Sequence, residues 1–338
     1  MNDRPPLPEG ELITGIIRIL SEADRWIVVT HCKPDGDTLG SGSAFLALGE
    51  SMGKKVAWGG PDPFPETYEF LYGSDRYVQG IAPDALAPKK GDAVIVLDTS
   101  TRERSVPGID FLPETVPVVN IDHHHDNERF GSIAWVDASA SSTGEMCWLL
   151  FKTWGAALSP EAAEALYTAI VTDCGNFTFS CTTSRTHEAA GELLDCGISP
   201  EKLDCMIRCS RSMEGLHLRG RALERIFPLG GTAACTWLTL QDFADTGSDP
   251  SETEGLVNEL LTLRSVSFAV LLVEEGDKIR ASFRSRGGIS AAKAAHRFGG
   301  GGHPQAAGCS LPLPLEEALR SVADLLEETD GLRSSSSE

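Results

Sequence analysis

A chain of 338 residues with 41% hydrophobic side chains is long enough for two compact domains and too apolar for a disordered protein. Its formal net charge of −20 argues against a basic face for long nucleic acid, so an anionic ligand must be held locally, by a few basic residues or by metal ions. Nine dispersed cysteines without a secretory signal predict reduced thiols and a cytoplasmic protein. No apolar run approaches the ~18 residues of a membrane span, so no membrane association is expected.

Short apolar runs alternate with helical periodicity through the N-terminal part of the chain. Runs typical of buried strands are found at residues 26–30, 55–58, 92–97 and 116–121. Helices are predicted at residues 12–20, 41–52, 142–154, 160–171 and 184–195. Strands and helices in alternation predict an α/β domain, with a parallel sheet and flanking helices.

From about residue 213 the pattern changes and predicts a smaller α+β domain. A helix at 213–226 is followed by strands at 232–240, 267–274 and 278–284, a helix near 291–298, a glycine cluster and a final helix near 315–328. The expected boundaries are 1–197 for the first domain, 198–212 for a linker, 213–330 for the second domain and 331–338 for a disordered tail.

Imidazoles and carboxylates follow three of the predicted strands of the first domain. They are His31, Asp35 and Asp37 after the first strand, Asp98 after the third, and Asp122, His123 and His124 after the fourth. Because the carboxyl ends of parallel strands share one edge, these side chains are expected to converge although about ninety residues separate them. Carboxylates so close together repel one another, and cations remove that repulsion.

The donor types indicate which cations these are. Carboxylates and imidazoles without thiolates suit Mn²⁺ or Mg²⁺, with iron or zinc possible. Asp173, after the helix at 160–171, is a candidate sixth ligand. Taken singly, Asp98 or Asp173 could be a helix N-cap, but caps do not explain the whole set.

A second group of residues indicates phosphate binding by the C-terminal domain. Four glycines, residues 299–302, precede His303 and give a backbone whose N–H groups can close on an oxyanion. The strand before them ends in Arg284, Ser285 and Arg286, and guanidinium groups are natural partners of phosphate. The sequence therefore predicts a substrate with phosphate groups, bound in a cleft between the two domains.

These motifs resemble those of the DHH family of phosphoesterases, which is named for the Asp-His-His found here at Asp122-His123-His124. Its first motif resembles His31-x-x-Pro34-Asp35-Gly36-Asp37-x-x-Gly40-Ser41, its second Asp98, and its fourth Asp173. The associated C-terminal domain resembles the stretch from Gly300 to Gly308, GGGHPQAAG. The compact architecture is most like the branch of nano-RNases and pAp phosphatases, which implies hydrolysis of very short RNA and of 3′-phosphoadenosine 5′-phosphate (pAp).

The resemblance also implies a role for each residue. Two divalent ions, Mn²⁺ foremost and Mg²⁺ as the alternative, would be held by His31, Asp35 and Asp98 and by Asp37, Asp98, His123 and Asp173. His124 would face the scissile phosphate, with Asp122 as its support. Further substrate contacts are implied for Arg104, Arg284, Ser285, Gly301, Gly302 and His303. Short RNA and phosphorylated nucleotides are the expected partners, and a homodimer is possible.

Four alternatives stay open at this point. A single-strand DNA exonuclease of the same family would be expected to carry an extra basic and aromatic binding domain. A cyclic-dinucleotide phosphodiesterase would usually have membrane and sensory segments, although a stand-alone form is conceivable. A pyrophosphatase would share the metal motifs and lack the GGGHPQAAG stretch. A nucleotide-binding regulator without catalysis would be expected to lose metal ligands, and all six candidate positions are filled here.

Overall fold

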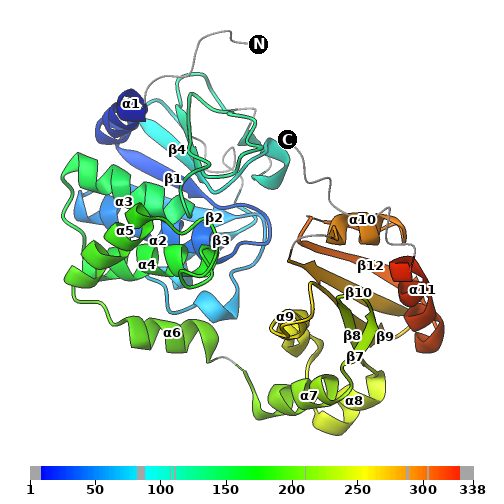
Figure 1. Ribbon diagram of the computed structural model, residues 1–338. Coiled ribbons are helices and arrows are strands. Elements are labelled where there is room, and N and C mark those ends of the chain that lie inside the picture. Colours follow the sequence, from blue (N-terminus) through cyan, green and yellow to red (C-terminus); the bar gives the residue numbers. More distant parts are fainter. Residues whose placement is uncertain are drawn as a thin grey trace. The chain divides into compact units, whose positions relative to one another are not determined.

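The computed structural model describes residues 9–81, 88–106, 108–109, 112–209, 211–286, 289–302 and 304–327 (Figure 1). The chain divides into two compact units, residues 1–210 and 211–338. Among the described residues, no helix is both long and apolar enough to cross a membrane.

The first unit is built on a parallel sheet, which confirms the predicted α/β class. Within the described residues, the sheet has six strands in the order β3-β2-β1-β4-β5-β6. The strands are β1 (Arg25–Val29), β2 (Lys55–Gly60), β3 (Val78–Gln79), β4 (Asp92–Leu97), β5 (Val118–Asp122) and β6 (Ile133–Val136). The direction of strand succession reverses between β1 and β4, which lie side by side, and ligands of open α/β sheets bind at this kind of reversal point.

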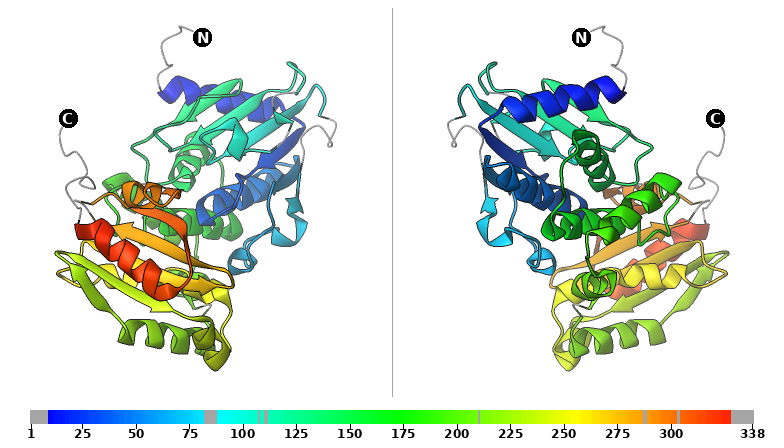
Figure 2. Two further views of the ribbon diagram at one scale, coloured as in Figure 1. Left: turned by 90° about the vertical axis from the view of Figure 1, so that its right-hand side faces the viewer. Right: turned by 90° about the vertical axis from the view of Figure 1, so that its left-hand side faces the viewer.

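Both faces of this sheet are buried, as the continuous apolar runs predicted. In β1, Trp26 and Val28 belong to a large core shared with the helices, whereas Ile27 and Val29 belong to a second core on the opposite face. Figures 1 and 2 show the helices of this unit beside the sheet. They are α1 (Glu9–Glu22), α2 (Gly36–Ser51), α3 (Thr143–Trp154), α4 (Pro160–Asp173), α5 (Ser184–Asp195) and α6 (Pro200–Arg208).

Helix α2 begins five residues before the predicted start at Ser41. Asp35 is its N-cap: the carboxylate Oδ1 accepts the backbone N–H groups of Asp37 and Thr38 at 3.1 and 3.2 Å. Gly40 lies inside the helix, where an added Cβ would come within 2.9 Å of Ala169 Cβ on α4. Gly40, directly before the predicted start of the helix, therefore permits close packing of α2 and α4.

Two further boundaries differ from the sequence-based prediction. Helix α4 continues through Asp173, so this candidate ligand is the last residue of the helix rather than part of a following loop. The segment 198–212, expected to be a linker, contains helix α6, and Leu203 of that helix is buried in the larger core of the first unit. The proposed domain boundaries stay predictions.

The second unit is a mixed sheet covered by helices on both faces. In the part of the chain that the structure describes, its strand order is β11-β12-β10-β9-β8-β7, with β8 and β9 parallel and the other neighbours antiparallel. The strands are β7 (Phe227–Gly230), β8 (Ala233–Leu238), β9 (Phe268–Glu275), β10 (Lys278–Ser285), β11 (Gly301–Gly302) and β12 (Ala306–Pro312).

The helices of the second unit pack on the two faces of this sheet. Helices α10 (Ala291–His296) and α11 (Leu315–Glu327) share one core with it, and α7 (Met213–Glu224) and α9 (Leu256–Leu261) share the other. The strand predicted at 232–240 ends at Leu238, because Thr239 and Asp242 form a capping box that starts helix α8 (Leu240–Thr246). The predicted α+β class is confirmed.

Candidate active site

The segment after β1 supplies a histidine with a defined orientation. His31 is only 2% exposed, and its Nδ1 lies 2.8 Å from the carbonyl oxygen of Cys32, which can only accept a hydrogen bond. The other ring nitrogen, Nε2, lies 3.2 Å from Oδ2 of Asp98 and 3.6 Å from Oδ1 of Asp35. The backbone contact therefore leaves Nε2 as the nitrogen that can ligate a metal ion.

Asp98, directly after β4, lies at the centre of the cluster. Its backbone has φ 54°, in the left-handed region that non-glycine residues seldom adopt and that is typical of functional sites. Oδ2 faces His31, whereas Oδ1 lies 3.5 Å from Nε2 of His123 and accepts the Thr143 hydroxyl at 3.1 Å. The two oxygens of one carboxylate thus face two different groups of potential ligands.

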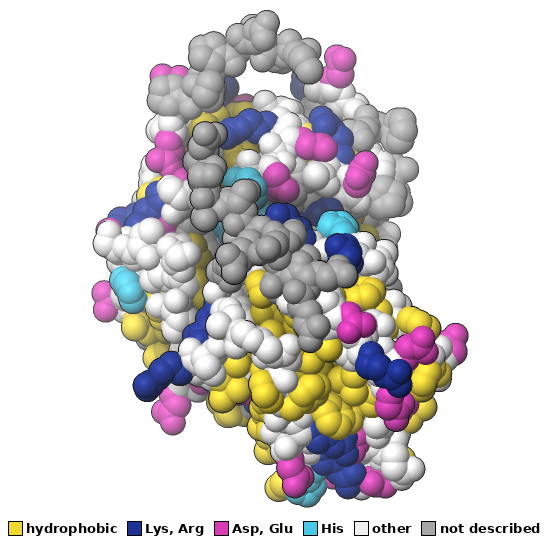
Figure 3. All heavy atoms as spheres, turned by 45° about the vertical axis from the view of Figure 1, so that its right-hand side comes forward, with side chains coloured by type: hydrophobic (Ala, Val, Ile, Leu, Met, Phe, Trp, Pro, Cys, Tyr) yellow, Lys and Arg dark blue, Asp and Glu magenta, His cyan; other side chains and the backbone are white. Residues whose placement is uncertain are grey.

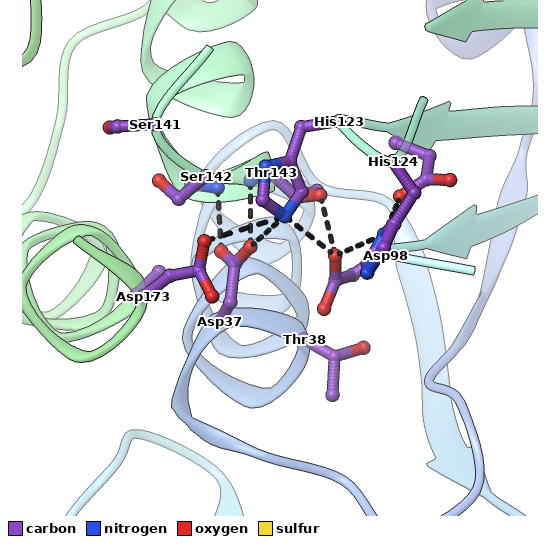
Figure 4. Close-up of polar contacts among 12 residues, drawn as sticks. Asp37, Thr38, Asp98, His123, His124, Ser141, Ser142, Thr143 and Asp173 are labelled. Atoms are coloured by element: carbon purple, nitrogen blue, oxygen red, sulfur yellow. Dashed lines mark hydrogen bonds and ion pairs between the residues drawn. The ribbon is translucent and has the colours of Figure 1, made fainter. Parts of the chain in front are cut away.

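Asp37 and Asp173 complete the side of the cluster around His123 (Figure 4). Nε2 of His123 lies 3.8 Å from Oδ2 of Asp37 and 3.4 Å from Oδ2 of Asp173. Asp37 is 1% exposed, and its two oxygens accept the backbone N–H groups of Thr143 and Gly144 at 2.7 and 2.8 Å. No sequence motif indicates this contact with the first turn of α3.

The donor set fits cations. Among the described residues, potential ligand atoms lie within 4.8 Å of one another in His31–Asp35–Asp98, in Asp37–His123–Asp173 and in Asp98–His123–His124. Burial raises the pKa of Asp37 well above its usual value, and repulsion from Asp98, Asp173 and Asp35 raises it further. Burial likewise raises the pKa of Asp173, to about 6. Positive charge beside these carboxylates would relieve both effects.

His124 lies beside this cluster and is oriented by a separate chain of hydrogen bonds. Its Nδ1 lies 2.7 Å from Oδ1 of the fully buried Asp122, and this contact raises the pKa of His124 to about 9. Oδ2 of Asp122 in turn accepts from Nδ2 of Asn127 at 2.5 Å, and the same amide contacts the Thr99 carbonyl at 3.0 Å. No sequence motif identifies Asn127, which is known only as a residue of the turn after β5.

Arg104 is also brought to this site. It belongs to the short 3₁₀ turn Arg102–Arg104, and its charge acts on His124, whose pKa it lowers against the larger effect of Asp122. The Arg104 carbonyl accepts the N–H of Cys32 at 2.8 Å, so this turn is joined to the segment after β1. A cation at this position can attract a phosphate group.

The second unit contains the other predicted contacts. Arg284 is half-buried on β10, and burial lowers the pKa of its guanidinium, which donates to the Phe283 carbonyl at 3.0 Å. Ser285 is buried, and its hydroxyl donates to the Pro304 carbonyl at 3.0 Å. Arg286, also considered for phosphate, instead donates to the backbone carbonyls of Leu263, Arg264 and Val266.

The glycine segment is partly a strand. Gly301 and Gly302 form β11, opposite Gly308 and Ala307 of β12. Gly302 has φ 140°, and a Cβ there would lie 2.5 Å from the Ala306 carbonyl oxygen, so only glycine fits. His303 lies outside the described residues.

Each of the two units of the chain is matched by a model of a known protein family. The family model described as "DHH family, N-terminal domain" matches residues 25–170, and the one described as "DHHA1 domain" matches residues 232–329. The chain belongs to the DHH family, as the sequence motifs indicated.

The chain is also similar to individual proteins over nearly its whole length. The chain is 34% identical over 323 residues to the "Bifunctional oligoribonuclease and PAP phosphatase NrnA" of Bacillus subtilis, covering 92% of this chain and 97% of that protein. The protein of the same name from Thermus thermophilus is 32% identical, with 89% of each chain covered. A solved exopolyphosphatase-related protein from Bacteroides fragilis has a TM-score of 0.85 at 28% identity, covering 94% of this chain and 96% of that one.

Proposed function

We propose that this protein is a metal-dependent phosphoesterase that hydrolyses very short RNA oligonucleotides and pAp. The observation that carries the proposal is the convergence of the six predicted metal ligands, from segments far apart in the sequence, into two groups joined by the contact between Asp98 and His123. Relatives more than 30% identical over nearly the whole chain bear the name bifunctional oligoribonuclease and PAP phosphatase, which supports both activities for this chain.

Two divalent cations, Mn²⁺ or alternatively Mg²⁺, are part of the proposal. His31, Asp35 and Asp98 would hold one, and Asp37, Asp98, His123 and Asp173 would hold the other. Ions at these positions supply Lewis acidity toward a phosphate group and lower the pKa of an attacking water. The mixture of carboxylates and imidazoles supports these hard or borderline cations.

The chain's own residues then orient the phosphate and move a proton. Nδ1 of His124 is engaged by Asp122, so Nε2 is the nitrogen left to donate a hydrogen bond to a phosphate oxygen or a proton to the leaving group. Asn127 donates to Asp122, which keeps that carboxylate an acceptor for His124. Arg104 adds a positive charge beside His124 and favours an anionic substrate.

Charge supports the preference for short substrates. The net charge of −20 repels a long polyanion, whereas a substrate of a few nucleotides meets chiefly the local field of the site. On the face drawn in Figure 3, lysine and arginine side chains lie scattered among acidic and hydrophobic ones. The proposal also includes a cytoplasmic location, because the nine free cysteines stay reduced there. A homodimer and a substrate cleft between the units stay predictions.

A length series tests the proposed function directly. With Mn²⁺ present, kcat/KM for RNA is expected to be highest at two to five nucleotides and to fall toward twenty-four, and pAp should be hydrolysed as well. A kcat/KM that rises steadily with length would contradict the proposal and favour a processive single-strand nuclease. Hydrolysis confined to cyclic dinucleotides would favour the phosphodiesterase alternative.

Replacing Arg284 by alanine tests whether the second unit contributes to substrate binding. A lost hydrogen bond between charged groups costs about 1.5–3 kcal/mol, so kcat/KM should fall about 10- to 150-fold while Mn²⁺ affinity is retained. Arg280→Ala is the matched control, because Arg280 lies on the same strand but is paired with Glu275 at 2.6 Å. An equal kcat/KM for the two variants would show that Arg284 does not contribute to substrate binding.

A further inference from the structure

The N-terminal end of helix α3 contacts two of the proposed metal ligands at once. Backbone N–H groups of Thr143 and Gly144 donate to the two oxygens of Asp37, and the Thr143 hydroxyl donates to Oδ1 of Asp98 at 3.1 Å. A Cβ on Gly144 would collide with Ala169 of α4 and lie 3.4 Å from Oδ1 of Asp37. The helix end is thus packed closely against the carboxylates, and any shift of it displaces them.

Glu145, in the same first turn of α3, holds this helix end through a separate set of partners. Its side chain is 0% exposed, and Oε2 accepts the hydroxyl groups of Ser141 and Thr186 at 2.6 and 2.7 Å. Oε1 accepts Nε of Arg185 at 2.5 Å. A buried carboxylate is costly unless a positive charge and hydrogen bonds compensate it, so these partners determine where Glu145, and with it the first turn of α3, can lie.

Arg185 connects the anchor to the ends of the sheet strands. It lies in the first turn of α5, and its Nη2 donates to Oδ2 of Asp137 at 2.6 Å. Asp137 directly follows β6, and its backbone N–H donates to the Asp122 carbonyl, at the end of β5, at 3.1 Å. One guanidinium group therefore joins the start of α3 to the strand ends that carry the cluster.

We propose that the Arg185–Glu145 ion pair is a positioning device for the metal centre. It fixes the helix end whose N–H groups orient Asp37 and whose hydroxyl orients Asp98. This inference rests on the proposed metal site. Loss of the hydrogen bonds that orient metal ligands typically weakens metal binding about 10–100-fold, whereas a merely structural ion pair would affect only the stability of the protein.

Arg185→Met keeps most of the aliphatic stem and removes both donors. We expect the Kd for Mn²⁺, measured by calorimetry on the folded protein without substrate, to rise about 10-fold, the lower end of the range for direct partners of a ligand, because Arg185 acts through Glu145 and the helix end. The matched control is Lys152→Met, which removes ion pairs between the same two helices, α3 and α5. Lys152 of α3 pairs with Glu188 and Glu192 of α5 at 2.9 and 2.7 Å in an exposed position, and its loss should leave the Kd for Mn²⁺ unchanged.

Native Mn²⁺ affinity in folded Arg185→Met, with only a lower unfolding temperature, would overturn the inference. If that variant does not fold, Arg185→Lys decides the matter. Lysine keeps the charge but lacks the forked donors that reach both carboxylates, so the variant should fold and bind Mn²⁺ more weakly; native affinity would again overturn the inference. If the native protein itself binds no Mn²⁺, the proposed metal site is wrong. If the native and variant proteins bind Mn²⁺ equally, the metal site stands and only the positioning role of Arg185 is wrong.

Discussion

Replacing Asp98 by asparagine is expected to abolish turnover and Mn²⁺ binding together. The Asp98 carboxylate faces both halves of the proposed centre, with Oδ2 at 3.2 Å from His31 Nε2 and Oδ1 at 3.5 Å from His123 Nε2. Asparagine has nearly the same shape and tolerates the left-handed backbone at φ 54°, so the change removes the charge and leaves the fold intact. The loss in kcat/KM should exceed the ~10–100-fold typical of residues that only orient a ligand.

Asp92→Asn is the control for this variant, because Asp92 begins the same strand that Asp98 follows. Its carboxylate pairs with Arg25 at 2.5 Å, at the opposite end of β4 from the cluster. The control should lose some stability and keep Mn²⁺ affinity and turnover. An Asp98→Asn protein with native metal content and rate would exclude a carboxylate shared by two ions. The measurements are metal content after dialysis and the rate on a dinucleotide.

The location of the cluster could be predicted because strand geometry determines it. Parallel strands place their carboxyl ends at one edge, so His31, Asp98 and His123, each following a strand end, had to lie near one another once the strands were recognised. The contacts of 3.2 and 3.5 Å that join them through Asp98 agree with this reasoning. Here the sequence pattern and the fold carry the same information.

The partners that orient the ligands could not be predicted in this way. Ser142-x-x-Glu145 is a recognisable helix start, but no local pattern shows that the N–H groups of this turn meet Asp37, about a hundred residues earlier. Asn127 is likewise an ordinary turn residue by sequence. Such contacts depend on how helices and loops pack in three dimensions. The hydrophobic periodicity of a single element gives no information about that packing.

The late predicted start of helix α2 has a related reason. Glycine disfavours helix interiors, and the predicted helix began at Ser41, directly after Gly40. In α2 the absence of a side chain at Gly40 allows α4 to come close, and this packing outweighs the weak helix propensity. The same absence at Gly302 permits β11 to pair with β12, so one residue type serves two structural purposes in the two units.

Replacing His124 by alanine should give the second large loss of activity, with a different signature. Because Nδ1 is held by Asp122 at 2.7 Å, Nε2 is the atom proposed to act on the phosphate, and its removal should lower kcat by ~10²–10⁴. Mn²⁺ affinity should be retained, since the two proposed ligand sets do not require His124. Single-turnover rates and calorimetric Mn²⁺ titration on the same preparation separate these two effects.

His125→Ala is the matched control for that experiment, because His125 is the next residue in the chain and is exposed. It should retain nearly the native kcat and the native Mn²⁺ affinity. Loss of Mn²⁺ binding in His124→Ala would instead make His124 a ligand, in the group it forms with Asp98 and His123. The two outcomes assign different chemistry to the imidazole: a retained metal with a low kcat identifies a proton or hydrogen-bond donor to the phosphate, and a lost metal identifies a nitrogen ligand of the ion beside Asp98 and His123.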